Sequence, residues 1–234
     1  ALHLAYKLLG VDQTKTVWTS PISFVATANM ALHVGSKIDF VDIDDETLNL
    51  SPDQLAYKLK NTKCKKDMPD VITVVHFAGN PCDMKKIFSL SQEYNFKIIE
   101  DASHALGAQY QNGYIGSNFY SSAATFSFHP VKMITTGEGG AITVKNEDDF
   151  KKINMWRSHG ITRDDNDYIK KNRPNWYYEQ HDLGYNYRLP EMSAALGLSQ
   201  MKRLEKFVKK RNRMSEIYKN ELHGLPLRFQ KVRK

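Results

Sequence analysis

The sequence predicts an α/β fold in which a mostly parallel sheet is flanked by helices. Strand-length apolar runs alternate with helix-length amphipathic stretches through residues 1–101, which is typical of βαβ units. The run VITVV at 71–75 is apolar throughout, as expected of a buried strand. With 234 residues, of which 41% are apolar, the chain can bury one sizeable core.

In chain order, the first half predicts helices and strands in alternation. They are a helix at 1–10, a strand at 16–20, a helix at 22–35, a strand at 37–44, a helix from 51, a strand at 71–79, a helix at 83–94 and a strand at 96–101. The clearest helix start has Ser51, Pro52 and Gln54 at the N-cap, first and third positions. This spacing is a capping box, and proline is tolerated at the first position because its missing N–H has no helical partner there.

The second half predicts fewer regular elements. Residues 123–128 and 139–144 read as two strands joined by a glycine-rich loop, and a helix is expected at 147–156. Residues 159–180 are polar and aromatic without periodicity, which predicts a long irregular segment of a kind that is usually functional or disordered.

Both ends of the chain look cut. The helical pattern at 1–10 has no capping residue before it, so we expect that helix to begin upstream. A long helix is expected from 190 to about 222, closed by Gly224 and Pro226. The residues after it look like a connection to a further element.

The charge balance and the cysteines limit the function classes. A net charge of +7 suits anionic partners such as nucleotides and phosphates. The basic runs at 60–66 and 202–213 are typical of solvated faces, and because no nucleic-acid-binding module accompanies them, we expect no nucleic-acid partner. Cys64 and Cys82 lack metal-ligand spacing, so we expect neither a metal site nor a disulfide. No apolar run approaches the roughly 18 residues of a membrane span, and a cytoplasmic protein without a membrane partner is expected.

Polar side chains fall where predicted parallel strands end, which is where ligands bind in such sheets. Asp101 ends one strand and Lys132 follows another by four residues, so both could face one crevice. A buried carboxylate needs a cationic partner, and the protonated ring nitrogen of pyridoxal phosphate would be one. That cofactor also needs a lysine for its aldehyde and donors for its phosphate, and Ser127 supplies a hydroxyl. The same spacing fits a surface lysine and an aspartate that caps a helix, and the residues alone leave both alternatives open.

Five blocks of the sequence occur in the order in which they occur in one enzyme family. They are EDASHALGA (100–108), the IGS stretch at 114–118, FSFHPVKMITTGEGG (126–140), RSHGI (157–161) and LGYNYRLPEMSAALGLSQ (183–200). With them the chain resembles the DegT/StrS-type sugar-nucleotide aminotransferases over nearly its whole length. Within that family, the stretches at 19–32 and 176–188 are most similar to the transaminases of pseudaminic acid synthesis. Those enzymes aminate C4 of a UDP-4-keto-6-deoxy-N-acetylhexosamine.

The resemblance implies a domain organisation. Residues 1–189 would form the large, pyridoxal phosphate-binding domain of a fold type I transferase, and residues 190–234 a long helix leading toward a small C-terminal domain that is largely absent. The family also carries a Gly-Thr-like pair, whose amides hold the cofactor phosphate, just before the helix at 1–10. If this chain is the whole polypeptide, we expect weak cofactor binding and little turnover. If it is part of a longer protein, that protein should be active.

The resemblance also implies a role for each matching residue in binding pyridoxal phosphate. Lys132 would bind the cofactor covalently and move the proton between the donor carbon and the cofactor carbon. Asp101 would pair with the ring nitrogen, His104 would approach the ring or its 3-hydroxyl, and Ser127 would contact the phosphate. Phe24 would stack on the ring; its other interpretation is an ordinary core aromatic.

Two further residues carry implied roles that involve a second subunit or the amino donor. Asn186 would reach the cofactor phosphate of a neighbouring subunit, which implies a homodimer with shared active sites. Arg188 would bind the carboxylate of the amino donor, usually L-glutamate in this family, although a structural salt bridge fits it nearly as well.

Three competing functions remain. The related sugar 3-dehydratases also use pyridoxal phosphate but lack the lysine, so Lys132 argues against them. A truncated, non-catalytic homologue could serve as a binding or assembly subunit through the basic face at 202–213. A basic nucleic-acid-binding domain would show salt-dependent binding to DNA or RNA.

Overall fold

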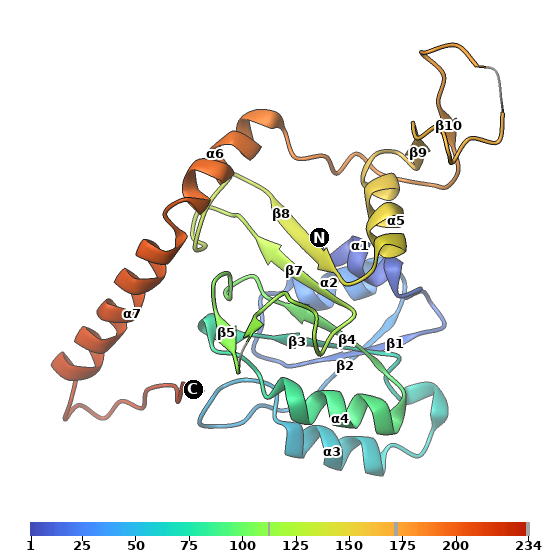
Figure 1. Ribbon diagram of the computed structural model, residues 1–234. Coiled ribbons are helices and arrows are strands. Elements are labelled where there is room, and N and C mark those ends of the chain that lie inside the picture. The colour runs from blue at the N-terminus through green and yellow to red at the C-terminus, as the bar shows by residue number, and fades with distance from the viewer. Residues whose placement is uncertain (112, 171–172, 233–234) are drawn as a thin grey trace.

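A central six-stranded sheet organises the computed structural model, which describes residues 1–111, 113–170 and 173–232 (Figure 1). The strand order is β2-β1-β3-β4-β7-β8. The strands are β1 (Thr16–Thr19), β2 (Lys37–Phe40), β3 (Val71–Val75), β4 (Lys97–Asp101), β7 (Ala123–Ser127) and β8 (Gly140–Val144). All neighbours pair in parallel except β8, which runs antiparallel to β7. The predicted α/β class is confirmed.

Helices cover both faces of the sheet, which gives three layers. One face carries α1 (Leu2–Leu8), α2 (Ala26–His33) and α5 (Glu147–Arg157), and the other carries α3 (Pro52–Asn61) and α4 (Met84–Tyr94) (Figure 1). Neighbouring strand residues point to opposite faces: Ile72 packs into the core under α3 and α4, whereas Val71 packs into the core under α1 and α2. The inner strands β1, β3, β4 and β7 are buried over most of their length, whereas the edge strands β2 and β8 are more exposed. Burial on both faces explains the continuous apolar run of β3.

The predicted helix start at Ser51 forms in part. The Ser51 hydroxyl accepts the Gln54 N–H over 3.3 Å, and Pro52 is the first helical residue. The Ser51 N–H donates to the Asp42 carbonyl oxygen instead of to Gln54, so the reciprocal half of the capping box is replaced by a contact to the preceding segment.

Several boundaries differ from the predicted ones. The helix expected at 22–35 begins only at Ala26. The strand expected at 37–44 ends at Phe40, and the strand expected at 71–79 ends at Val75. The segment at 159–180, expected to be irregular, contains the short antiparallel pair β9 (Ile161–Thr162) and β10 (Glu179–Gln180), which projects from the body of the molecule (Figure 1). Other short elements were not predicted: the antiparallel strands β5 (Gln109–Tyr110) and β6 (Gly113–Tyr114), and the 3₁₀ turns η1 (Lys65–Asp67) and η2 (Phe77–Gly79).

The prediction of one long helix from 190 to about 222 is wrong. The segment forms α6 (Glu191–Met201) and α7 (Leu204–Glu221), which lie along one side of the molecule (Figure 1). Packing explains why the two helices take different paths. Gly197 of α6 lies so close to Thr136 that a Cβ would be 2.8 Å from its methyl carbon, while Leu204 and Val208 of α7 lie against Gly107. Within the described residues, no helix is both long and apolar enough to cross a membrane.

Candidate active site

A cleft of about 630 Å³ lies at the carboxyl ends of the parallel strands. Its walls include Phe24 beyond β1, Val75 at the end of β3, Asp101 at the end of β4 and Ser127 at the end of β7. Further lining residues come from α1 and α2, from the segment after β4, from the turn between β7 and β8, and from the segment between β10 and α6. They include His3, Met30, His104, Lys132, Gly139 and Tyr187. The cleft therefore occupies the position at which open parallel sheets bind ligands.

Asp101 is a buried carboxylate in this cleft, with 4% of its surface exposed. Three donors meet it: the Thr27 hydroxyl at 2.7 Å, and the Ser103 hydroxyl at 2.6 Å and backbone N–H at 3.2 Å. Among the described residues, no cationic side chain lies within 4.0 Å of it. A buried carboxylate is costly unless it is hydrogen-bonded or paired, so a cationic group of a ligand would be a favourable partner for Asp101.

Tyr6 holds Thr27 in place through a hydrogen bond to its backbone. The Tyr6 hydroxyl donates to the Thr27 carbonyl oxygen at 2.9 Å and lies 2.8 Å from the Thr73 hydroxyl. Burial raises the pKa of the Tyr6 hydroxyl, so it remains a neutral donor. Asp101 thus rests on a chain of buried polar groups that joins α1, α2 and β4.

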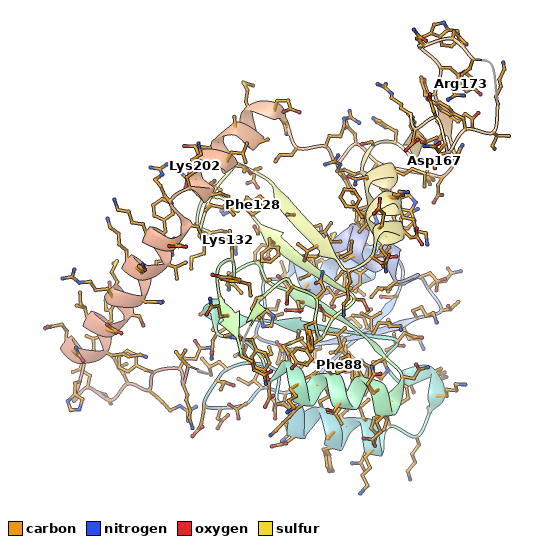
Figure 2. All side chains as sticks on the ribbon, viewed as in Figure 1. Phe88, Phe128, Lys132, Asp167, Arg173 and Lys202 are labelled. Carbon is orange, nitrogen blue, oxygen red and sulfur yellow. The ribbon has the colours of Figure 1, made fainter. Side chains whose placement is uncertain are left out.

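Lys132 lies in the turn between β7 and β8, near the α6–α7 junction (Figure 2). Its backbone N–H donates to the His129 carbonyl oxygen at 2.9 Å, and its carbonyl oxygen accepts from the Arg211 guanidinium at 3.2 Å. Burial lowers the pKa of the Lys132 amine, and the Asp101 charge offsets part of that shift. A lowered pKa increases the neutral, nucleophilic fraction of an amine.

His104 lines the same cleft. Its Nδ1 accepts the Ala78 N–H at 3.3 Å. Burial lowers the pKa of its imidazole, the Lys132 charge lowers it further, and Asp101 acts in the opposite direction. The ring is therefore a neutral group at physiological pH.

Phe24 and Ser127 complete the predicted residues that meet in this cleft. Phe24 is 72% exposed, which rules out the interpretation as an ordinary core aromatic. An exposed aromatic face at a cleft is suited to stacking on a planar ligand. Ser127 is the last residue of β7, and its hydroxyl accepts a long contact, 3.4 Å, from the His129 N–H.

Asn186 and Arg188 do not line this cleft. Asn186 forms an antiparallel bridge with Ser158, and Arg188 lines a different cleft of about 1030 Å³ together with Arg157 and Arg163. Tyr187, between them, faces the first cleft, and its hydroxyl lies 2.9 Å from Nδ1 of His3. Alternation along this extended segment explains why one tyrosine faces inward and its two neighbours do not. The implied role of Asn186 concerns a neighbouring subunit, which a single chain does not test.

Sequence reasoning missed Thr27, Ser103 and Tyr187. Ser103 and Tyr187 lie within blocks that carried the family resemblance, and Thr27 lies in the stretch at 19–32, but a hydroxyl in such a stretch has no signature of its own. Ser103 follows Asp101 by two residues, which is the spacing of an Asx-type turn and could have indicated its contact.

The glycines beside Lys132 have a structural reason. A Cβ on Gly140 would lie 2.5 Å from the Phe126 carbonyl oxygen, so a larger residue would push β8 away from β7 at the edge of the cleft. Because Gly139 and Gly140 both line the cleft, the same feature lets a ligand approach the backbone closely.

These observations fit pyridoxal phosphate. One cleft brings together an amine with a lowered pKa, a buried carboxylate and an exposed aromatic face. Three donors bond to the carboxylate, and among the described residues no cationic side chain lies within 4.0 Å of it. A hydroxyl at the end of β7 is available for a phosphate. No cluster of three or more potential metal ligands was found in the described ranges.

Comparisons with known proteins identify the family. The model of the DegT/DnrJ/EryC1/StrS aminotransferase family matches residues 1–234. The UDP-4-amino-4,6-dideoxy-N-acetyl-beta-L-altrosamine transaminase of Campylobacter jejuni subsp. jejuni serotype O:2 is 42% identical over 226 residues, which are 97% of this chain and 56% of that protein. The spore coat polysaccharide biosynthesis protein SpsC of Bacillus subtilis is 36% identical over 97% of this chain and 56% of its own length.

Solved structures show the same fold. Helicobacter pylori PseC, an aminotransferase involved in the biosynthesis of pseudaminic acid, superposes with a TM-score of 0.81 at 30% identity, covering 97% of this chain and 58% of that one. The PLP form of Spr1654 from Streptococcus pneumoniae gives a TM-score of 0.79 at 26% identity, over 96% of this chain and 58% of that one.

The chain spans a little more than half the length of the curated relatives it matches. The fold and the family expected from the sequence are confirmed, as is the pyridoxal phosphate dependence of that family. The chain belongs to the DegT/DnrJ/EryC1/StrS aminotransferase family.

Proposed function

We propose that the protein containing this chain transfers the amino group of L-glutamate to C4 of a UDP-4-keto-6-deoxy-N-acetylhexosamine, with pyridoxal phosphate as cofactor. The observation that carries the proposal is that Lys132 and Asp101 line one cleft at the carboxyl ends of the strands. The sugar is proposed from the resemblance to the Campylobacter jejuni transaminase. A cytoplasmic location is part of the same proposal, since nucleotide sugars are cytoplasmic metabolites.

In this proposal the cleft residues orient the cofactor. Asp101 would pair with the ring nitrogen, Phe24 would stack on the ring and Ser127 would bind the phosphate. When bound, pyridoxal phosphate supplies an electron sink that stabilises negative charge on the carbon next to the transferred nitrogen. Three hydrogen bonds hold the Asp101 carboxylate at the cleft, which supports its assignment to a cationic ring nitrogen.

Lys132 would hold the cofactor and would also move a proton. Its amine would bind the cofactor covalently and would serve as the group that carries the proton between the donor carbon and the cofactor carbon. Its lowered pKa supports both tasks, because each requires a neutral amine near neutral pH.

Asn186 acts across a subunit boundary in this proposal, and Arg188 binds the carboxylate of the amino donor. Asn186 would bind the cofactor phosphate of a second copy of the chain. Its position outside the cleft of its own chain supports this assignment. It requires at least a homodimer with shared active sites.

The test is amino-group transfer from ¹⁵N-labelled L-glutamate to the keto sugar, followed by mass spectrometry of the nucleotide sugar. Lys132→Ala should lower the rate at least about a thousandfold while the protein stays folded. Lys145→Ala, which removes a lysine outside the cleft, is the matched control and should leave the rate unchanged. Undiminished transfer by Lys132→Ala would overturn the proposal.

A further inference from the structure

The turn η2, at Phe77–Gly79, lies directly against His104. The Ala78 N–H donates to Nδ1 of the ring at 3.3 Å, and a Cβ on Gly79 would lie 2.9 Å from the His104 carbonyl oxygen. The turn therefore contacts both the side chain and the backbone of His104.

This turn has an unfavourable backbone. Ala78 has a φ of 53° and Gly79 a φ of 82°. The left-handed region is strained for any residue with a Cβ, so contacts from elsewhere must hold Ala78 in it.

Asn49 supplies such contacts. Its Oδ1 accepts the Phe77 N–H at 3.0 Å, and its Nδ2 donates to the Asn80 carbonyl oxygen at 2.9 Å. One amide group thus joins the first residue of the turn to the residue that follows it. Asn49 is 1% exposed, so water does not compete for these bonds.

The loop that carries Asn49 is itself fixed. The Leu48 N–H donates to the Asp44 carbonyl oxygen at 2.7 Å, and the Asp44 N–H donates to the Asn49 carbonyl oxygen at 2.9 Å. From the C-terminal segment, the Gln230 side chain donates to the Phe77 carbonyl oxygen at 3.3 Å. Side chains from two segments, Asn49 and Gln230, therefore hold the turn in place, and Asn49 is the buried one.

We propose that Asn49 is a positioning residue: by holding this turn it keeps the Ala78 amide on Nδ1 of His104, which leaves the imidazole protonated at Nε2 as a hydrogen-bond donor to the cleft. A neutral imidazole has one donor and one acceptor nitrogen, so occupying Nδ1 as an acceptor fixes the tautomer. The partner of the Nε2–H donor would be an acceptor oxygen of the bound cofactor or substrate. This part of the inference alone rests on the proposed function.

Charges around His104 favour the same neutral form. Burial and the Lys132 charge lower the pKa of the ring, and only Asp101 raises it. A second proton on Nδ1 would also break the bond from Ala78. The ring therefore acts as a fixed neutral donor beside Lys132.

The test reads the tautomer directly, in the protein without cofactor. ¹⁵N-histidine NMR should show Nδ1 of His104 unprotonated and Nε2 protonated in the wild type. Asn49→Ala removes the hydrogen bonds to Phe77 and Asn80 and should give a mixture of His104 tautomers. Hydrogen exchange of the Ala78 amide should become about tenfold faster. Asn49→Asp keeps an acceptor for Phe77 but loses the donor to Asn80, so it should fall between the two.

The matched control is Asn118→Ala, because Asn118 is also buried, at 2% exposure, but bonds to Thr143 on β8. It should leave the His104 signals unchanged although it destabilises the fold. Gly79→Ala provides a second route to the same disturbance should Asn49→Ala fail to fold. A wild type protonated at Nδ1, or Asn49 variants that match Asn118→Ala, would overturn the proposal.

A second measurement separates this inference from the proposed function. The affinity for pyridoxal phosphate should fall about tenfold in Asn49→Asp and stay constant in Asn118→Ala. An unchanged affinity with a changed tautomer would overturn the assignment of this donor to the cofactor. Failure of the wild type to bind the cofactor at all would refute the proposed function, while the tautomer result would stand independently.

Discussion

The Thr27 hydroxyl donates to the Asp101 carboxylate across 2.7 Å, and it joins two buried residues that are 74 positions apart in the chain. Asp101 is also bonded to Ser103 at its other oxygen. Two hydroxyls and one backbone amide thus donate to a carboxylate that has no described cationic side chain within 4.0 Å. The stability of the fold with this carboxylate buried depends on these hydrogen bonds.

Removing the Thr27 hydroxyl should be costly. Thr27→Val keeps the shape but removes a hydrogen bond to a charged group, so the free energy of unfolding at pH 7 should fall by about 1.5–3 kcal/mol. Urea denaturation measures it. Ser36→Ala is the control, since Ser36 is a buried hydroxyl that donates to the neutral Ala31 carbonyl oxygen at 2.8 Å. An equal or smaller loss in Thr27→Val would show that Thr27 does not stabilise the carboxylate.

The Lys132 amine should react with acylating reagents at lower pH than a solvated lysine. Its pKa in the folded protein lies below the ordinary value of 10.5 that it has in the unfolded chain. Between these two pKa values the folded state binds fewer protons than the unfolded state. The free energy of unfolding therefore rises as the pH increases toward 10.5. Trace acetylation across a pH series, with peptide mapping, measures the pKa.

Because the Asp101 charge raises the Lys132 pKa, Asp101→Asn should lower it further. Asp39→Asn removes an exposed carboxylate that pairs with Lys58 and should leave Lys132 unchanged. An ordinary lysine titration at position 132 would contradict the burial argument.

The projecting segment around β9 and β10 should lose order in acid. Glu179 is bonded by His181 and by the N–H groups of Ile169 and Lys170, which lower its pKa from 4.5 to about 2. The stabilisation is complete above pH 4.5 and is lost as pH falls through about 2. Amide chemical shifts of Ile169 and Lys170 should follow this titration. A midpoint near the ordinary glutamate value would show that Glu179 does not organise the segment.

Gly140 should not tolerate a side chain. Gly140→Ala places a Cβ 2.5 Å from a backbone oxygen that cannot move without separating β7 from β8. We expect a loss of about 1–3 kcal/mol in the free energy of unfolding. Gly137→Ala meets no atom within 4 Å and carries only the strain of a φ of 79°, so it should cost less. The reverse order would argue against the close strand approach.

The sequence predicted most elements whose pattern is local. The Ser51 cap, the apolar run at 71–75 and the strands on either side of Lys132 appear where the periodicity placed them. The α6–α7 break was not predictable, because neither Gly nor Pro stands at Lys202 or Arg203; contacts with Thr136 and Gly107 direct the two helices.

Some residues of the site were predictable from local sequence, and others were not. Asp101 and Lys132 were predictable because both follow strands in a parallel sheet, and the structure brings them together. Thr27, Tyr187 and Asn49 act through partners far away in the chain, so local sequence offered no signal for their contacts.

The central claim is that the Lys132 amine binds pyridoxal phosphate in the cleft that holds Asp101. The direct measurement is an absorbance spectrum of the protein with added cofactor, before and after borohydride reduction, with peptide mapping of the label. We predict a visible band that reduction abolishes, with the label on Lys132 in the wild type and absent at that position in Lys132→Met. A label spread over surface lysines, or an unchanged spectrum in Lys132→Met, would contradict the account.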